Sequence, residues 1–561
     1  MKNRATLKEI FTGRHFFVPE YQRAYTWESK AQNRSAKTQT DVFLDDLLAH
    51  MASGAHAPYY LGHILFERAE KDTFGIIDGQ QRLTTVMLLL YALRDVLKAT
   101  GAEALPRMPF PDSFKMVSYD SQFFVDYFAT GQKTATPVFA TNSARRLWEC
   151  FCYFTAKLRA LPAESLSVLA DTVCNAMCTT HVVTQHTEAI QMFLFQNNRG
   201  KKPSSLEVIK AQFMLFAHLY GANARAALVD ELNSRFSAIY RYANTIENWM
   251  DEDTVLAHTV RIHSNSLWGE EALGYVTKKL DTDQERIQFI QDFTLLLEQN
   301  FAHLEQFLTQ DNTIQNLSIH SLISLNRFSV VLPFILKSYS FSLSLADKNA
   351  LCAKLASLAL RHALIGTRAE LESRLNDVFQ AFTSEQKDIQ PILVRIDDLK
   401  NTPDTSWWWA YWNNAALERA VQGKIPTPLA RFLLWQYEVH LAQTAGTPGY
   451  VPMRFDDISY PELEHIAPQT EPQGGGPQNG YPAYDEKFTA QYLNCLGNYL
   501  LASKQHNASL GNAPFRIKCA KYKPLYQQRE VASMVYPDGD WTIAAIAARK
   551  EKLVAYITST F

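Results

Sequence analysis

The chain has 561 residues, which is too long for one ordinary domain and enough for about three. Hydrophobic residues make up 47% and charged residues 20%, a composition that supports large cores and excludes global disorder. The formal net charge is -2, so the chain lacks the basic surface typical of many nucleic-acid-binding proteins. Any binding of DNA must therefore use local basic patches.

No apolar run approaches the roughly 18 residues that span a bilayer, and the first residues lack the apolar core of a signal peptide. The 7 cysteines include no CxxC pair, which favours reduced and buried thiols over disulfides or a structural zinc site. We therefore expect a cytoplasmic protein without a membrane segment.

The N-terminal part predicts a mixed α/β region. Phe16–Pro19 is short, apolar and ended by proline, as an edge strand would be, and Asp41 is expected to cap a helix. Tyr59–Phe66 and Phe74–Ile77 predict two strands joined by a polar turn. A long helix with regularly spaced apolar residues is expected to begin after Asp78–Gly79.

The middle of the chain, from about residue 140 to about residue 400, predicts mainly helices, such as Arg286–Phe307 and Asp347–Leu364. The glycine- and proline-rich stretch Pro468–Pro482 predicts a surface loop. Glu486–Leu501 predicts helical or mixed structure, and Trp541–Tyr556 predicts a terminal amphipathic helix. A cluster of four tryptophans favours a core or interface over base stacking; its members are Trp407, Trp408, Trp409 and Trp412.

The first candidate site is the turn Asp78-Gly79-Gln80-Gln81-Arg82, between a predicted strand and a predicted helix. The free N–H groups and the dipole of a helix N-terminus attract an anion. Arg82 in the first helical turn opposes that dipole, and a bound phosphate would relieve the conflict. From the residues alone, a phosphate site and an ordinary helix start with a solvated arginine are equally good interpretations. The chain contains no GxxxxGK[ST] loop, which excludes a P-loop NTPase.

Three segments accompany this turn: VPEYQRAYTW at Val18–Trp27, YYLGHILF at Tyr59–Phe66, and Phe195–Gly200 followed by Leu206–Lys210. Together they make about the first 215 residues resemble the N-terminal domain of GmrSD-type modification-dependent (type IV) restriction enzymes, a ParB/sulfiredoxin-like fold. Residues 196–200 depart from the Leu-Asn-x-Arg-Gly order of relatives, which leaves the role of Asn197 open. The resemblance implies nucleotide binding and hydrolysis by Asp78, Gly79, Gln80, Gln81, Arg82, Tyr21, Gln22, Arg23, Asn198, Arg199 and Lys210.

The second candidate site comprises EHIAP at Glu464–Pro468, LGNYLL at Leu496–Leu501, and Asn507. Phosphodiester hydrolysis needs a base that deprotonates water and a cation that stabilises the developing charge. A histidine suits the base, and a hard divalent ion prefers oxygen ligands. Each position alone reads more simply as a structural histidine or a turn-capping asparagine. The three motifs in this order, from about residue 425 to about residue 560, resemble the HNH-like nuclease domain of the GmrSD family.

This second resemblance implies His465 as the general base, Asn498 as an orienting residue and Asn507 as a ligand for Mg²⁺ or Mn²⁺. Glu464 is implied as a further metal ligand, and His506 competes with Asn507 for that role. In a nuclease, nearby cations would contact DNA phosphates, which position DNA without reading its sequence; these are Lys504, Arg516, Lys518 and Lys521.

The sequence thus predicts a predominantly α-helical α+β protein with three parts. They are a ParB/sulfiredoxin-like nucleotide-binding and sensing domain (residues 1–215), a helical linking domain (216–400) and an HNH-like (ββα-metal) nuclease domain (401–561).

The predicted function is a nucleotide-regulated, metal-dependent DNA endonuclease of type IV restriction or anti-phage defence, with NTPase activity in its N-terminal domain. Its expected partners are double-stranded, modified phage DNA and a nucleoside triphosphate (GTP, ATP or UTP). The alternative is a catalytically degenerate DNA- or nucleotide-binding regulator. The DNA modification, the nucleotide and the oligomeric state, a homodimer included, stay open.

Overall fold

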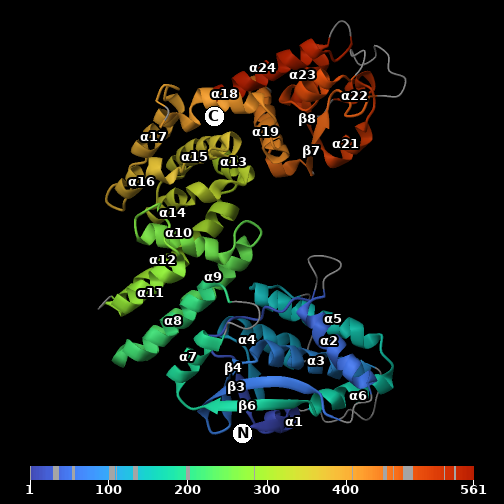
Figure 1. Cartoon of the computed structure of the whole chain (residues 1–561), viewed down its shortest axis with the longest axis vertical. Coiled ribbons are helices and arrows are strands. Elements are labelled where there is room, and N and C mark those ends of the chain that lie inside the picture. The colour runs from blue at the N-terminus through green and yellow to red at the C-terminus, as the bar shows by residue number, and fades with distance from the viewer. Residues whose placement is uncertain are drawn as a thin grey trace. The chain divides into compact units, whose positions relative to one another are not determined.

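The protein divides into two compact units in the computed structural model (Figure 1): residues 1–260 with 270–302, the N-terminal unit, and residues 261–269 with 303–561, the C-terminal unit. The boundary falls within the helical middle of the chain, so the units differ from the three segments expected at 1–215, 216–400 and 401–561. The structure describes residues 2–29, 37–53, 57–99, 108, 110–130, 137–196, 203–282, 285–406, 408–446, 452–458, 460–471, 484–522, 525–535 and 539–561.

A six-stranded mixed sheet lies in the N-terminal unit, in the order β1-β6-β3-β4-β2-β5. Its strands are β1 (Arg4–Thr6), β2 (His15–Phe17), β3 (Tyr60–Glu70), β4 (Thr73–Asp78), β5 (Ser113–Lys115) and β6 (Met177–Val183). β3 and β4 form the predicted antiparallel hairpin. The expectation of an edge strand at Phe16–Pro19 is wrong, because β2 pairs in parallel with both β4 and β5. Pro19 lies two residues beyond Phe17, the last residue of β2, where it removes no hydrogen bond from the ladder.

Helix α3 (Gln80–Ala99) is the central helix of this unit and is buried on almost every side. In Figure 1, α2 (Gln39–Ala52), α3 and α5 (Asn142–Arg159) lie along one face of the sheet. Helix α2 is capped by Thr38, and Asp41 is the reciprocal residue of the capping box rather than the cap itself. The other helices of this unit are α1 (Leu7–Phe11), α2 (Gln39–Ala52), α4 (Ser118–Phe124), α5 (Asn142–Arg159), α6 (Ala163–Cys174), α7 (His186–Gln196), α8 (Ser205–Tyr220), α9 (Arg225–Ile246), α10 (Glu252–His263), α11 (Ala272–Thr282) and α12 (Arg286–Glu305), of which α10 and α12 run past its boundaries.

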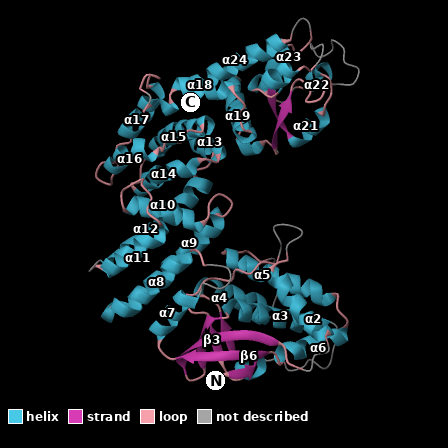
Figure 2. Ribbon diagram, in the orientation of Figure 1, coloured by secondary structure: helices cyan, strands magenta, loops and turns pink. Residues whose placement is uncertain are grey.

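The C-terminal unit is a helical array followed by a small α/β region, and its strands form a separate two-stranded ribbon (Figure 2). The ribbon pairs β7 (Pro461–His465) with β8 (Tyr499–Ser503) in antiparallel fashion. Helix α21 (Lys504–Leu510) follows β8 at once, which produces a strand–strand–helix arrangement. The remaining helices are α13 (Leu317–Leu325), α14 (Leu332–Ser340), α15 (Leu345–Ile365), α16 (Glu372–Ala381), α17 (Gln390–Asn401), α18 (Asn414–Gln422), α19 (Thr427–Thr444), α20 (Glu486–Phe488), α22 (Phe515–Lys521), α23 (Tyr526–Met534) and α24 (Ile543–Thr560).

The tryptophan cluster is divided between core and surface. Trp412 is fully buried, whereas the side chains of Trp408 and Trp409 are 52% and 39% exposed. The guanidinium of Arg374 lies 4.5 Å from the ring centre of Trp408 and 5.0 Å from that of Trp409. The predicted core role therefore holds for Trp412, and Trp407 lies outside the described residues.

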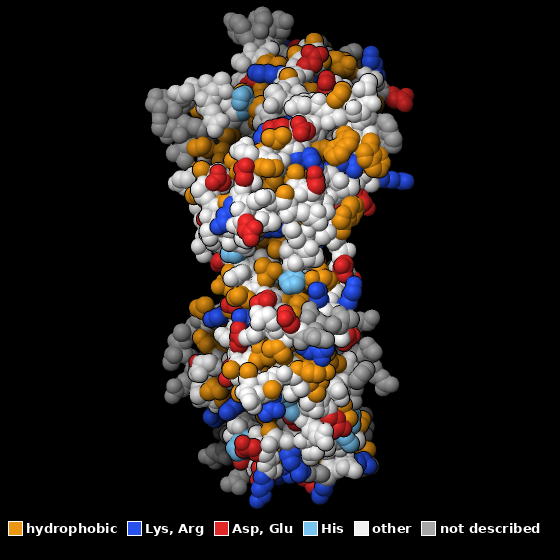
Figure 3. All heavy atoms as spheres, turned by 90° about the vertical axis from the view of Figure 1, so that its left-hand side faces the viewer, with side chains coloured by type: hydrophobic (Ala, Val, Ile, Leu, Met, Phe, Trp, Pro, Cys, Tyr) orange, Lys and Arg blue, Asp and Glu red, His pale blue; other side chains and the backbone are white. Residues whose placement is uncertain are grey.

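Charges of both signs are interspersed on the face drawn in Figure 3, in agreement with a net charge of -2. Five of the seven cysteines are buried, and no disulfide joins any of the seven, all of which lie in the described part of the chain. Within that part, no single helix has the length and apolarity to cross a membrane. One pair of segments, Ile314–Leu325 and Phe328–Ser340, passes that test only jointly and is bent by 115°.

The C-terminal unit contains a histidine that burial keeps neutral. His320 is 2% exposed, and its Nε2 accepts a hydrogen bond from the backbone N–H of Phe455 at 3.0 Å. Its Nδ1 lies 2.8 Å from Oδ1 of Asn312, which fits a proton on Nδ1. Burial, assisted by the charge of Arg454, lowers the pKa of His320 to about 4.

We predict that His320 makes the free energy of unfolding depend on pH. An unfolded histidine binds a proton near pH 6.5, whereas folded His320 stays neutral to about pH 4. The stabilisation is therefore complete above pH 6.5 and decreases as the pH falls toward 4, by at most about 1.4 kcal/mol per unit. Thermal denaturation at pH 7.5 and pH 5 should show a larger loss for the wild type than for His320→Gln. Equal losses would contradict this assignment.

Candidate functional site

The turn between β4 and α3 has the conformation that the sequence predicts. Gly79 has φ +88°, and a Cβ there would meet Ile64 Cγ1 at 3.3 Å, so glycine suits the position both in backbone conformation and in space. The exposed Asp78 accepts a hydrogen bond from the N–H of Gly79 at 2.8 Å. This bond fixes the turn and leaves the start of α3 next to an exposed carboxylate.

Glutamine side chains join this turn to the VPEYQRAYTW segment. Gln81 Nε2 donates to the carbonyl of Ala24 at 2.9 Å, and Gln81 Oε1 accepts from the N–H of Thr26 at 2.8 Å. Gln22 Nε2 donates to the carbonyl of Ile77. Both glutamines are buried, so their contacts hold the two motifs together and do not face a ligand directly.

Arg82 contacts His63 and Gly62 of the YYLGHILF segment, and the sequence did not reveal the role of Gly62. Its Nη1 donates to the carbonyl of His63 at 3.2 Å. Gly62, with φ +124°, lies against the guanidinium, and a Cβ at this position would overlap Nη1. The glycine within YYLGHILF therefore makes room for the arginine of DGQQR.

Tyr21 belongs to a different set of contacts from Gln22. Its hydroxyl donates to Glu67 Oε2 at 3.3 Å, and His186 Nδ1 lies 2.5 Å from Glu67 Oε1. Burial, with the neighbouring charge of Glu67, raises the pKa of Tyr21. Glu67 and His186 were not among the predicted site residues, because neither lies in a recognisable motif.

Arg23 lines a cavity of about 560 Å³ together with Arg146, Glu207 and Glu252. Burial, followed by the charge of Glu207, raises the pKa of Glu252 to about 7. The cavity is therefore lined by both basic and acidic side chains. Asp78 and Arg82 are not among its lining residues.

Lys210 is enclosed by aromatic rings. It is 1% exposed, and its Nζ lies 5.3 to 5.7 Å from the ring centres of Tyr119, Tyr240 and Phe236. Burial lowers the pKa of Lys210 to about 8. The ammonium therefore cannot touch a ligand without rearrangement. Asn198 and Arg199, also predicted to bind nucleotide, lie outside the described residues.

In the C-terminal unit, Asn498, which the resemblance implies as an orienting residue, has hydrogen-bond partners in several segments. Its side chain is fully buried, and Oδ1 accepts from the N–H of Ala467 at 2.8 Å and from Trp541 Nε1 at 3.1 Å. Its Nδ2 donates to the carbonyl of Leu493 at 2.9 Å. One amide thus joins the end of β7 to two other segments.

His465 is the last residue of β7 and pairs with Tyr499 in β8. Its Nε2 lies 3.1 Å from Oδ1 of the exposed Asn494, and its ring meets that of Tyr499 edge-on at 4.9 Å. Burial, with a smaller effect of the Lys518 charge, lowers the pKa of His465, against the opposing hydrogen bond to Asn494. The imidazole is therefore neutral at pH 7, the form that can accept a proton.

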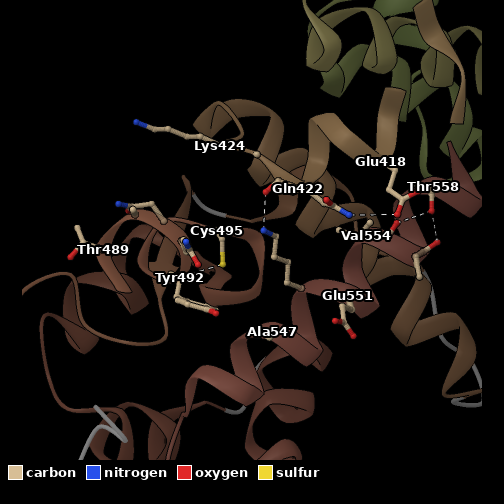
Figure 4. Close-up of a pocket in the computed structure, with 16 residues that line it drawn as sticks. Glu418, Gln422, Lys424, Thr489, Tyr492, Cys495, Ala547, Glu551, Val554 and Thr558 are labelled. Carbon is tan, nitrogen blue, oxygen red and sulfur yellow. Dashed lines mark hydrogen bonds between the residues drawn. The ribbon is translucent and has the colours of Figure 1, made fainter. Parts of the chain in front are cut away.

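Asn494 also lines a pocket of about 960 Å³ (Figure 4). Side chains from α18, from residues 489–495, which begin with a π-helical turn, and from α24 surround it, among them Tyr492, Lys550 and Glu551. Because Asn494 contacts His465, the pocket lies one side chain away from the imidazole.

The resemblance implies Glu464 as a metal ligand, but in this structure its carboxylate contacts two protein side chains. It is 3% exposed, and its Oε1 accepts from Lys518 Nζ at 2.8 Å and from the hydroxyl of Tyr522 at 3.0 Å. Lys518 is 1% exposed, so the expectation that it contacts DNA phosphates from the surface does not fit its position. The basic stretch that contains Lys518 predicts a face exposed to solvent, but the side chain of Lys518 points from α22 into the protein.

Asn507 and His465 have separate partners. Asn507 Nδ2 donates to Glu462 Oε2 at 2.7 Å. Glu462 and His465 lie three residues apart in β7, so their side chains project from opposite faces. His506 donates its backbone N–H to Ser503 Oγ at 3.3 Å. Among the residues that the structure describes, no three His, Cys, Asp or Glu side chains are placed to hold a metal ion. Glu464 with Asn507, or with its rival His506, therefore stays a predicted ligand set, and the carboxylate of Glu464 and the amide of Asn507 have protein partners in this structure.

The other predicted DNA contacts lie on the surface. Lys504, Arg516 and Lys521 are exposed. Arg516 pairs with Asp540 at 2.9 Å, and Lys521 Nζ donates to the carbonyl of Ser509 at 3.0 Å. These three cations are accessible to a phosphate.

Comparison with protein families gives two matches. Residues 7–214 match the family described as GmrSD restriction endonuclease, N-terminal domain. Residues 412–556 match GmrSD restriction endonucleases, C-terminal domain. Comparison with curated proteins gives no match. The two families cover both candidate sites, in the order in which the sequence places them.

We predict that Asn498→Ala loosens the end of β7. The change removes the Asn498 partner of two buried N–H donors and of the carbonyls of Leu493 and Ala467, at a cost of about 2–4 kcal/mol. Hydrogen–deuterium exchange of the segments at residues 461–468 and 499–503 should accelerate accordingly. Asn401→Ala, at the exposed end of α17 in the same unit, is the matched control and should leave their exchange nearly unchanged. Equal protection in Asn498→Ala and the wild type would contradict the role of Asn498.

Proposed function

Because the chain belongs to the GmrSD restriction endonuclease family, we propose that nucleotide handling in its N-terminal unit controls DNA cleavage in its C-terminal unit. The family makes the protein a type IV restriction endonuclease, and DNA is its substrate. The proposal adds the regulation by nucleotide, the chemistry of the two sites and their residues.

The observation that carries the cleavage proposal is the partly buried imidazole of His465 at the end of β7, which contacts Asn494 at the edge of the pocket and whose pKa is lowered by burial. Such a group can accept a proton from water at neutral pH, which supports its role as the general base. The succession β7, β8 and α21 supports an HNH-type domain. Asn498 acts by holding the strand end, and Lys504, Arg516 and Lys521 provide exposed positive charge for the DNA backbone.

Nucleotide binding is proposed at the start of α3. The free N–H groups of the first helical turn and the Arg82 guanidinium, anchored to the His63 carbonyl, are suited to a phosphate. The ligand would be a nucleoside triphosphate, GTP, ATP or UTP, and its hydrolysis would belong to this unit. Modified phage DNA, an anti-phage role in the cytoplasm and a homodimer complete the proposal.

The divalent ion, Mg²⁺ or Mn²⁺, stays a prediction of the resemblance. Glu464 is engaged by Lys518, and Asn507 by Glu462, so these side chains as placed do not fit a metal centre. No step of the proposed reaction is assigned to the ion.

The same observation favours a second candidate function, a DNA- or nucleotide-binding regulator whose nuclease centre is degenerate. Such a protein would retain the exposed cations and the phosphate site at α3 without cleaving DNA. Binding without any cleaved product, on modified and unmodified DNA, distinguishes it from the endonuclease.

We predict that His465→Ala lowers the rate of DNA cleavage by about 100- to 10,000-fold, the usual contribution of a general base. Single-turnover cleavage of plasmid DNA measures this, and nucleotide hydrolysis should be unchanged. His440→Ala, at an exposed position of α19, is the matched control and should cleave at the wild-type rate. A His465→Ala protein that cuts as fast as the wild type would refute the assignment.

We predict that Arg82→Ala weakens nucleotide binding by about 10- to 100-fold, because a charge-assisted hydrogen bond is lost. Gly62→Ala should weaken it as well, since the added Cβ displaces the guanidinium while the arginine remains. Titration calorimetry measures both, with Arg159→Ala, at the exposed end of α5, as the control. Unchanged affinity in Arg82→Ala would remove the arginine from the site.

A further inference from the structure

The buried side chains of Glu464, Lys518 and Tyr522 form a hydrogen-bonded network that contacts the backbone of His465. Glu464 Oε1 accepts from Lys518 Nζ at 2.8 Å and from the Tyr522 hydroxyl at 3.0 Å. The same Lys518 ammonium donates to the backbone carbonyl of His465 at 2.7 Å. The exposed fractions of the three side chains are 3%, 1% and 3%, so the network is shielded from solvent.

The chemistry of this network argues against a metal ion at Glu464. A divalent cation on this carboxylate would lie close to an ammonium that is already 2.8 Å from one of its oxygens. Like charges at such a distance repel strongly where water is excluded. Moving Lys518 away would leave a buried ammonium without its partner, which is unfavourable.

We propose that Glu464 and Lys518 form a positioning pair that fixes the backbone of His465, and that Glu464 is not a metal ligand. The inference rests on the proposed function, because it assigns the pair a role in presenting the general base. Lys518 is a positioning residue, since its buried ammonium does not reach the reacting atoms.

The pair acts together with Asn498 on the backbone that runs from His465 to Ala467. Lys518 holds the carbonyl of His465, and the side chain of Asn498 holds the N–H of Ala467, two residues further on. The N–H of Ile466 donates to the carbonyl of Asn498 at 2.9 Å. Three consecutive residues are thereby fixed, and the imidazole is directed toward Asn494.

The metal-ligand interpretation and the positioning interpretation make opposite predictions for Lys518. If Glu464 bound the ion, removing the competing ammonium would tighten metal binding and increase cleavage at limiting Mg²⁺. If the pair positions His465, the same change lowers kcat at every Mg²⁺ concentration and leaves metal affinity alone.

The experiment uses the full chain with Lys518→Met and, because a lone buried carboxylate endangers folding, the double variant Glu464→Gln/Lys518→Met. The double variant retains side-chain size and a hydrogen-bond acceptor for Tyr522, and it removes both charges. Plasmid cleavage over a range of Mg²⁺ concentrations gives kcat and KM for DNA. Titration calorimetry with Mn²⁺ alone gives metal affinity without reference to activity.

We expect both variants to lose about 100-fold in kcat, the scale of a misplaced catalytic group, with KM for DNA and Mn²⁺ affinity within twofold of the wild type. Tighter Mn²⁺ binding in Lys518→Met, or weaker binding in the double variant, would overturn the proposal. Wild-type kcat in the double variant would overturn it as well.

Lys337→Met is the matched control. Lys337 is 3% exposed and donates to the carbonyls of Phe379 and Phe382 at 2.7 and 2.8 Å, within the helical array of the same unit. Its removal should lower thermal stability and leave kcat per folded molecule unchanged. A loss of kcat equal to that of Lys518→Met would show a general packing effect and refute the positioning role.

Failure of this inference is distinct from failure of the proposed function. If His465→Ala abolishes cleavage while the double variant cleaves normally, His465 is the base and only the pair is misassigned. If His465→Ala also cleaves normally, the proposed function itself is wrong.

Discussion

The side-chain amide of Asn498 is the constraint on which the C-terminal site depends. It replaces a missing length of backbone ladder beyond β7, because its oxygen receives the N–H of Ala467 and the indole N–H of Trp541. A strand of five residues has little stability of its own, and its last residue is His465. Buried side-chain hydrogen bonds therefore decide where the imidazole lies, and hydrophobic packing around Trp541 protects them from water.

The N-terminal unit uses the same device in another fold. Gln22 and Gln81 hold a segment without regular secondary structure against β4 and α3, as the ladder of a sheet would. Both candidate sites thus consist of a strand end fixed by buried amides, with one ionisable group presented at its edge: Arg82 in one unit and His465 in the other. In both units, the asparagine and glutamine side chains of the sequence motifs therefore help to fix the position of the ionisable group.

Local chemistry made much of this predictable. The polar residues between two apolar runs predict the hairpin of β3 and β4, and Asp78–Gly79 predicts the turn from β4 into α3. The terminal helix follows from its amphipathic pattern. The role of Asn498 as an orienting residue came from the resemblance of the C-terminal motifs, and its buried hydrogen bonds are compatible with that role. The buried position of Lys518 was not predictable, because a lysine in a basic stretch normally faces water, and only the packing of α22 against β7 turns it inward. Gly62 was also missed, since its purpose is space for an arginine 20 residues later. The prediction that β2 is an edge strand was wrong because the order of strands in a sheet depends on tertiary contacts, which a nearby proline does not reveal.

The central claim is that this chain cuts DNA, as its family membership states, through the strand-end site at His465. The most direct measurement incubates the wild-type protein with Mg²⁺ and nucleotide on plasmids that carry different base modifications, and resolves the products on a gel. The account predicts relaxed or linear DNA from at least one modified plasmid. Intact DNA under every condition, from protein that still binds both nucleotide and DNA, would contradict it.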